Sequence, residues 1–271
     1  MTYCLAMKVQ DGLVGISDTR LTAGNQTLIA KKVYIQNETN KHAVFFMTSG
    51  LRALRDKALI YFQEMVEEDR DKFKKMHQLV NAFGAQIRRV SEEDRKPLTE
   101  AGYEFNIHVL IAGQLEEDDE HKLFMLFPEG NWVEVGQGNP YFIIGNSGHG
   151  KPMLDRVLRY DSTMDFALKV GFLSFNATRV SANDVEFPID VMFYKKNSYE
   201  VIHQRFERQD LQKFSDWWQK VIKEAVEQFP QEWSTEVFDR FLGKTKEQQQ
   251  SVEMMSSFQA SQVKINQQVQ Q

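Results

Sequence analysis

The sequence begins Met1-Thr2-Tyr3-Cys4-Leu5-Ala6-Met7-Lys8-Val9, and the turn Gln10-Asp11-Gly12 connects this run to a second apolar run at residues 13–18. An Asp-Gly pair between two short apolar runs is typical of a β-hairpin. We therefore expect the chain to start with two antiparallel strands. Because facing residues of a hairpin lie close together, we expect Asp18 to lie near Thr2.

Thr2 carries chemistry that few residues can provide. Removal of Met1 would leave a residue with both a hydroxyl nucleophile and a free α-amine. The amine titrates at about 7.7–8.0 and can take the proton of the hydroxyl. Thr is small enough for the preceding Met to be trimmed, so no propeptide is needed. Many proteins have Thr at this position by accident, so Thr2 alone does not establish an enzyme.

The composition sets limits on the class of protein. The 271 residues are 42% hydrophobic and 26% charged, which is ordinary for one large or two small globular domains. The net charge of −5 gives no basic surface for nucleic acid. The single Cys4 fits a reducing compartment. Because no apolar run is long enough for a membrane span or a signal peptide, we expect a soluble cytoplasmic protein.

Strands and helices are predicted in blocks along the chain. Beyond the hairpin, apolar runs predict strands at 32–36, 43–48, 104–113, 121–127, 131–136, 140–144, 189–195 and 199–205. Apolar stripes of helical spacing predict helices at 51–66, 74–90, 152–160, 163–179, 209–228 and 231–242. Blocks of this kind favour a layered α+β architecture over alternating βαβ units. Two sheets between helix layers would fit the order.

Several boundaries follow from local signals. The charges at 92–95 are expected to be solvated and to lead to Pro97 outside the helix, and Ser162 is expected to cap the helix at 163–179. The stretch from Gly24 to Lys32 is expected to be a loop. We predict one domain over 1–242 and a Gln-rich tail over 243–271, either a frayed helix or disordered.

Asp18 and a following lysine form the first candidate constellation. Lys31 and Lys32 begin the next predicted strand, and neighbouring strands lie about 4.8 Å apart. A buried ammonium needs a carboxylate partner, and an ammonium near the Thr2 hydroxyl would lower its pKa. The alternative is a surface turn with ordinary charges.

Thr48-Ser49-Gly50 lies between a predicted strand and a predicted helix. Free backbone N–H groups at a helix start suit an oxyanion, and Gly50 allows a substrate carbonyl to approach closely. The alternative is a simple helix cap by Thr48 or Ser49.

Together these stretches carry a resemblance. Thr2-Tyr3-Cys4, the Asp18-x-Arg20-x-Thr22-Ala23-Gly24 spacing, residues 145–156, Pro188-Ile189-Asp190 and the aromatic-rich helix at 209–228 resemble the proteasome β-subunit superfamily of N-terminal-nucleophile hydrolases. Within that superfamily the chain is most similar to the bacterial Anbu group. The resemblance covers about residues 2–230.

The resemblance implies a four-layer αββα sandwich and amide-bond hydrolysis. It implies Thr2 as nucleophile, Asp18 paired with Lys32 or alternatively Lys31, and Gly50 as donor to the oxyanion. Thr22 is expected to bind the substrate backbone at the sheet edge. Further supporting residues are expected among Arg20, Ser147, Ser181 and Asp184.

The resemblance also implies a homo-oligomer, ring or ring-like, that acts on a peptide or amide substrate. Some members use a partner ATPase. No cofactor, metal, nucleic acid or membrane is expected. The six His are scattered without metal-ligand spacing.

Three other interpretations were weighed. Retention of Met1 would give a non-hydrolytic scaffold or peptide-binding subunit. A small-molecule amidase would use the same nucleophile. Residues 145–151 match the spacing of a phosphate-binding loop, but Pro152 stands where that motif needs Ser or Thr. We therefore interpret residues 145–151 as a strand-to-helix loop.

Overall fold

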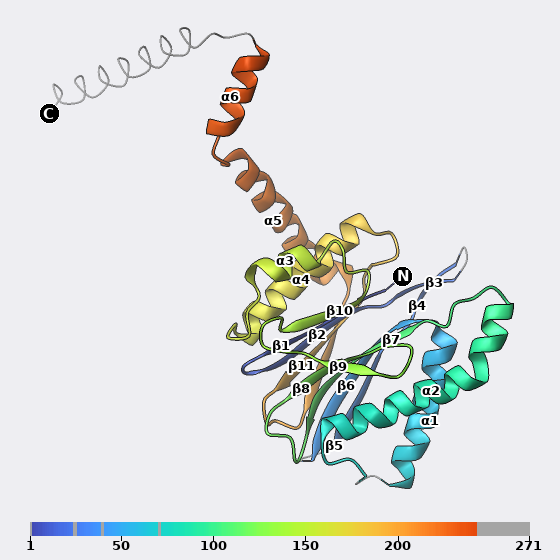
Figure 1. Cartoon of the computed structure of the whole chain (residues 1–271). Coiled ribbons are helices and arrows are strands. Elements are labelled where there is room, and N and C mark those ends of the chain that lie inside the picture. Colours follow the sequence, from blue (N-terminus) through green and yellow to red (C-terminus); the bar gives the residue numbers. More distant parts are fainter. Residues whose placement is uncertain (1, 24–25, 39–40, 70–71, 243–271) are drawn as a thin grey trace, which may run out of the picture. The chain divides into compact units, whose positions relative to one another are not determined.

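A computed structural model describes residues 2–23, 26–38, 41–69 and 72–242 (Figure 1). The chain divides into two compact units between Asp216 and Trp217. The first unit holds all the described strands and the helices α1 to α4. The predicted Gln-rich tail at 243–271 lies outside the described residues.

The first sheet contains the predicted N-terminal hairpin at its centre. Its five strands pair in the order β10-β1-β2-β11-β12, and every pair is antiparallel. The bounds are β10 Tyr141–Gly145, β1 Tyr3–Val9, β2 Gly12–Asp18, β11 Ile189–Lys195 and β12 Val201–Phe206. The hairpin prediction is confirmed, because Val9 pairs with Gly12 across the turn.

The second sheet has five antiparallel strands in the order β5-β6-β7-β8-β9. They are β5 Val33–Glu38, β6 His42–Gly50, β7 Ile107–Leu115, β8 Lys122–Leu126 and β9 Trp132–Glu134. Its long central pair, β6 with β7, ends at Gly50 opposite Ile107. This end of the second sheet contributes one wall of the candidate site.

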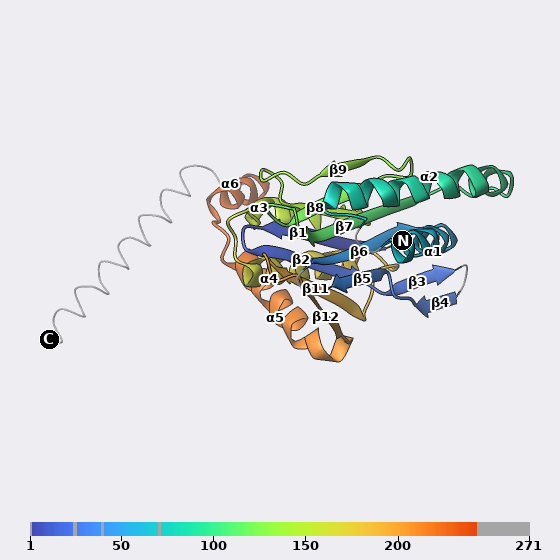
Figure 2. The same cartoon turned by 90° about the horizontal axis from the view of Figure 1, so that it is seen from below.

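Three apolar clusters separate four layers. One lies between the second sheet and the helices α1 Arg52–Glu68 and α2 Met76–Glu100, and one lies between the first sheet and the helices α3 Lys151–Val157 and α4 Met164–Ser181. The third fills the space between the two sheets. Figure 2 shows the sheets between the helices from a second direction. The predicted α+β sandwich of αββα layers is confirmed.

The layering explains why β1 is apolar along its whole length. Tyr3, Leu5 and Met7 pack in the cluster beneath α3 and α4, whereas Cys4 and Ala6 pack between the sheets. Successive side chains of a strand point to opposite faces. Both faces of this strand are covered, so its sequence shows a continuous apolar run instead of an alternating one.

The predicted loop from Gly24 to Lys32 is wrong in part. Two short strands, β3 Arg20–Ala23 and β4 Gln26–Ile29, pair there as a separate antiparallel ribbon. The backbone N–H of Ala30 donates to the carbonyl oxygen of Thr19 at 2.8 Å and closes the base of the ribbon. Polar residues without an apolar alternation gave no strand signal in this segment.

The helix predicted at 74–90 continues to Glu100 and includes Pro97. The charges at 92–95 are exposed or half-exposed, as expected, and two of them also pair with α1. The Lys57 ammonium of α1 lies 2.6 Å from a Glu93 oxygen and 2.8 Å from an Asp94 oxygen. Proline removes one helical donor, and these ion pairs to α1 hold the turn before it.

The start of α4 also differs from the prediction. Thr163, not Ser162, is the N-cap, and its hydroxyl accepts a hydrogen bond from the backbone N–H of Phe166 at 3.2 Å. Ser162 instead accepts from the N–H of Arg159. Ser162 and Thr163 are both suitable N-cap residues. The sequence alone could therefore not show which of the two caps α4.

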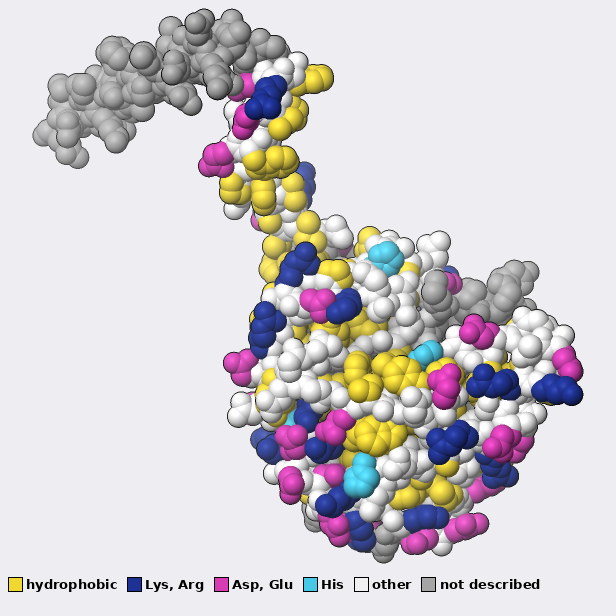
Figure 3. All heavy atoms as spheres, in the orientation of Figure 1, with side chains coloured by type: hydrophobic (Ala, Val, Ile, Leu, Met, Phe, Trp, Pro, Cys, Tyr) yellow, Lys and Arg dark blue, Asp and Glu magenta, His cyan; other side chains and the backbone are white. Residues whose placement is uncertain are grey.

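Two helices complete the described chain, α5 Arg208–Glu227 and α6 Glu232–Phe241, close to their predicted ranges. Hydrophobic side chains gather on the surface of the second unit (Figure 3). Those more than half exposed are Trp217, Val226, Phe229, Trp233, Val237, Phe238, Phe241 and Leu242. Among the described residues, no helix is long and apolar enough to cross a membrane.

Candidate active site

Thr2 lies directly before β1, at the end of the first sheet, and is only 8% exposed. Its carbonyl oxygen accepts a hydrogen bond of 2.7 Å from the backbone N–H of Asn146. Gly145 has a φ of +89°, and a Cβ there would lie 1.9 Å from the Thr2 carbonyl oxygen. Only glycine fits at 145 without moving the backbone that holds Thr2.

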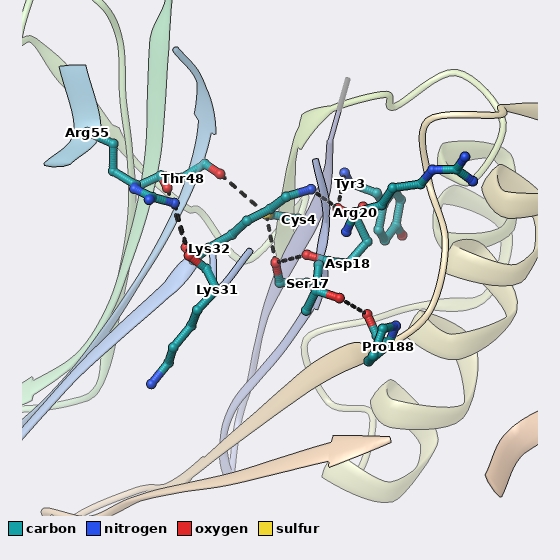
Figure 4. A network of polar contacts seen from close by, with 11 residues as sticks. Tyr3, Cys4, Ser17, Asp18, Arg20, Lys31, Lys32, Thr48, Arg55 and Pro188 are labelled. Carbon is teal, nitrogen blue, oxygen red and sulfur yellow. Dashed lines mark hydrogen bonds and ion pairs between the residues drawn. The ribbon is translucent and has the colours of Figure 1, made fainter. Parts of the chain in front are cut away.

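Asp18 is the polar centre of the site. One carboxylate oxygen accepts from the Lys32 ammonium at 2.6 Å and from the backbone N–H of Tyr3 at 2.9 Å. The other accepts from the N–H of Arg20 at 3.2 Å. The Asp18 side chain is fully buried, and that of Lys32 is 4% exposed. Figure 4 shows Lys32 extending toward Asp18 from the neighbouring segment.

The backbone of Lys32 is fixed by the second sheet. Its carbonyl oxygen accepts from the N–H of Thr48 at 3.2 Å and from the Thr48 hydroxyl at 3.4 Å. β5 begins at Val33, so Lys32 immediately precedes the strand instead of starting it. Lys31 is exposed, and its ammonium points away from Asp18 (Figure 4). The geometry therefore favours Lys32 over Lys31 as the partner of Asp18.

Burial raises the pKa of the Asp18 carboxyl, and its hydrogen bonds offset this shift only in part. The Lys32 ammonium and the two backbone N–H groups lower the pKa. An unpaired carboxylate could not remain charged at this depth. The Lys32 ammonium therefore favours the charged form of Asp18.

Cys4 carries the single thiol of the sequence, and this thiol is not activated as a nucleophile. Its sulfur lies 3.2 Å from the Ser17 hydroxyl and is fully buried. Burial raises the pKa of the Cys4 thiol to about 12. Since the thiolate is the nucleophilic form, Cys4 stays protonated and unreactive near neutral pH.

Gly50 ends β6 with a φ of +112°. A Cβ at this position would lie 2.1 Å from the carbonyl oxygen of Asn106. That carbonyl accepts the backbone N–H of Leu51 at 2.9 Å. The turn from β6 into α1 thus requires glycine both for its backbone angle and for space.

A cleft with two arms opens beside Thr2. The large arm has a volume of about 660 Å³ and the small arm about 20 Å³. The two arms share five lining residues, namely Thr2, Leu21, Ser49, Gly50 and Leu51. Lys32 lines the small arm and Gly145 lines the large arm. The large arm can therefore receive a peptide beside Thr2.

The other residues that the sequence predicted for the site do not gather around Thr2. The backbone of Arg20 bonds Asp18, but its guanidinium points away from Lys32 (Figure 4). Thr22 lies in β3 opposite Thr27. Ser147 is exposed in the loop after β10. Ser181 ends α4, and Asp184 follows it; neither lines either arm of the cleft.

Sequence reasoning missed the residues that hold the backbone of the site. Gly145 and Asn146 fix the Thr2 carbonyl, and Pro188 accepts both the N–H and the hydroxyl of Thr19 at 3.1 and 2.7 Å. A signal for the first pair existed, because Gly145 opens the stretch resembling a phosphate-binding loop. In this structure Gly145 allows the backbone to pass close to the carbonyl oxygen of Thr2.

Comparison with known proteins identifies the family of the chain. The family model described as proteasome subunit matches residues 2–184. The chain belongs to the proteasome subunit family, whose members are proteasome-type proteases.

Within that family, the structure is similar to Anbu. Anbu from Yersinia bercovieri superimposes with a TM-score of 0.78 at 27% identity, covering 84% of this chain and 97% of that chain. A Gly-1 mutant of Anbu from Hyphomicrobium gives 0.78 at 26% identity, covering 85% and 98%. The helical assembly of the Anbu complex from Pseudomonas aeruginosa gives 0.78 at 24% identity, covering 84% and 97%. No curated protein sequence matches the chain.

Proposed function

We propose that the chain is a threonine-type peptidase or amidase that cleaves amide bonds through Thr2 after removal of Met1. The observation that carries this proposal is the buried Asp18–Lys32 ion pair beside the cleft that Thr2 and Gly50 line together. A buried ion pair contributes little to stability compared with apolar packing. Its position next to a terminal hydroxyl supports a chemical role.

In the proposed reaction the Thr2 hydroxyl attacks the carbonyl carbon of an amide. The free α-amine of Thr2 takes the hydroxyl proton and gives it to the departing amine as the C–N bond breaks. The carbonyl carbon is then esterified to the Thr2 oxygen. Water, activated by the same amine, cleaves the ester and releases the acid.

Lys32 and Gly50 have supporting roles in this proposal. The Lys32 ammonium lines the small arm with Thr2, and its charge favours the deprotonated hydroxyl. Asp18 holds that ammonium in place. The backbone N–H of Gly50 is proposed to donate to the negative oxygen that develops during attack.

We also propose that the chain works as a homo-oligomer. The hydrophobic side chains exposed on the second unit, such as Trp217 and Trp233, would be covered by self-association. The Pseudomonas relative is itself described as a helical assembly. Light scattering at several concentrations measures the mass of the particle, and a stable monomer throughout would contradict this part of the proposal.

Intact mass followed by active-site labelling tests the mechanism. The purified protein should lack Met1, and an electrophile that needs both a hydroxyl and an adjacent amine should add once to Thr2. The Thr2→Ala variant should not be labelled. Persistent labelling of that variant would point to another nucleophile. Retention of Met1 on the native protein would contradict the proposal and favour a non-hydrolytic scaffold.

A further inference from the structure

The two arms of the cleft differ in charge as well as in size. Among the described residues that line the small arm, the charged ones are Lys32, Arg52 and Arg55, and all three are cations. Among those that line the large arm, Glu104 is the one formal charge at neutral pH. The cations of the small arm are each paired with a carboxylate, Asp18 or Asp56, whereas the large arm carries the carboxylate of Glu104.

His108 does not offset the charge of Glu104. The imidazole lines the large arm next to Asn106, 3.2 Å from its side-chain oxygen. Burial lowers the pKa of His108, although the nearby Glu129 carboxylate acts against this effect. His108 is therefore neutral near pH 7, so among the side chains that line the large arm the charge of Glu104 is not offset.

Glu104 is available to a ligand. Its side chain is exposed, and it makes no ion pair or hydrogen bond within the part of the chain that the structure describes. The arms differ here, because Arg55 already donates to the carbonyl oxygen of Lys31 and to Asp56. An unpaired carboxylate in a cleft is a ready partner for a cation.

Part of the remaining wall of the large arm is apolar. Leu51, Met125, Phe127 and Ile143 form this part, and polar residues such as Ser49 and Asn106 line the rest. A Lys or Arg side chain combines an apolar stem with a charged tip, and such side chains bury the stem while the tip stays in water. The stem matches this wall and the tip matches Glu104. The small arm, at about 20 Å³, has room for little more than one water.

We infer that the substrate is a peptide with a basic residue beside the cleaved bond, bound in the large arm by Glu104. This inference rests on the proposed function and names its substrate class. Glu104 is then a specificity-determining residue at the rim of the site, while Thr2 remains the reacting group.

Matched quenched peptides test the inference. Each carries Ala paired with Lys, norleucine or Glu at the central bond, in both orders. In the order that is cleaved, kcat/KM for the Lys peptide should exceed that for norleucine about two- to fivefold, the range expected for an exposed ion pair. Glu104→Gln should bring this ratio to about one, and Glu104→Lys should favour the Glu peptide. Glu92→Gln, which removes an exposed charge of α2 outside the cleft, should leave the ratio unchanged.

A binding measurement separates this inference from the proposed function. Fluorescence anisotropy with the Thr2→Ala variant reports peptide affinity without hydrolysis. Tighter binding of the Lys peptide that disappears with Glu104→Gln supports the inference even if no peptide is cleaved. Cleavage of all three peptides with equal kcat/KM overturns the inference and leaves the proposed function standing. Equal affinities of the Lys, norleucine and Glu peptides overturn it as well.

Discussion

The Lys32 ammonium lies 2.6 Å from an Asp18 carboxylate oxygen, and neither side chain is more than 4% exposed. The two residues come from different sheets, since Asp18 ends β2 and Lys32 precedes β5. The contact therefore ties the two sheets together at the edge where Thr2 and Gly50 meet. Breaking it should affect both the stability of the fold and the chemistry of the cleft.

Asp18→Asn should destabilise the protein and abolish labelling of Thr2. The Lys32 ammonium would remain buried without a partner, which typically costs about 3–5 kcal/mol. Urea unfolding measures the stability loss, and the electrophile assay measures labelling of the folded fraction. Asp190→Asn is a matched control, because Asp190 is also buried and bonds Arg205 at 2.9 and 2.8 Å. It should lose stability but keep the labelling.

Replacing both partners should cost less than replacing one. In Asp18→Asn/Lys32→Met no buried charge is left unpaired, so the free energy of unfolding should exceed that of either single variant. The labelling rate should nevertheless stay near zero. A double variant as unstable as the sum of the single variants would show that the pair does not interact.

Gly50→Ala should lower stability by more than backbone strain alone. The new Cβ would lie 2.1 Å from the Asn106 carbonyl oxygen. Gly102→Ala isolates the strain, because Gly102 has a φ of +79° with nothing within 4 Å, and it should cost about 1–3 kcal/mol. Gly148→Ala has neither problem and should be nearly neutral. Equal melting temperatures for the Gly50 and Gly102 variants would refute the steric argument.

Cys4 should make the protein sensitive to alkali. Burial raises the pKa of its thiol from 9.0 to about 12, so the folded state holds a proton that the unfolded state loses. Its contribution to stability is complete below about pH 9 and is lost as the pH rises toward 12, at about 1.4 kcal/mol per pH unit. Cys4→Ala should flatten this part of the stability profile. Tyr194, whose pKa is raised to about 12, should account for part of the remaining slope.

The layered fold was predictable from the order of strands and helices, and the hairpin placed the first candidate residues. The hairpin of β1 and β2 is a local feature, so its turn signal was enough to bring Asp18 close to Thr2. Asp18-x-Arg20 and the two lysines were visible as residue types. The choice of Lys32 over Lys31 needed the backbone, because only the bonds from Thr48 show which ammonium faces inward.

The sequence could not predict which strands distant along the chain pair with each other. β10 pairs with β1 across more than a hundred residues, and β11 pairs with β2 across a still longer separation. No local signal specifies such partners. Gly145 could therefore be recognised as unusual, but its role at the Thr2 carbonyl depended on knowing that β10 lies beside β1.

The hydrogen bond from Asn146 to the Thr2 carbonyl also bears on when Met1 could be removed relative to folding. An aminopeptidase must handle the peptide bond before Thr2, yet Thr2 is nearly inaccessible once β10 has closed beside it. The ribosome makes residue 146 more than a hundred residues after Thr2, which at 5–20 residues per second leaves roughly 7–30 seconds. The proposed removal of Met1 is therefore expected to take place on the growing chain, before β10 pairs with β1.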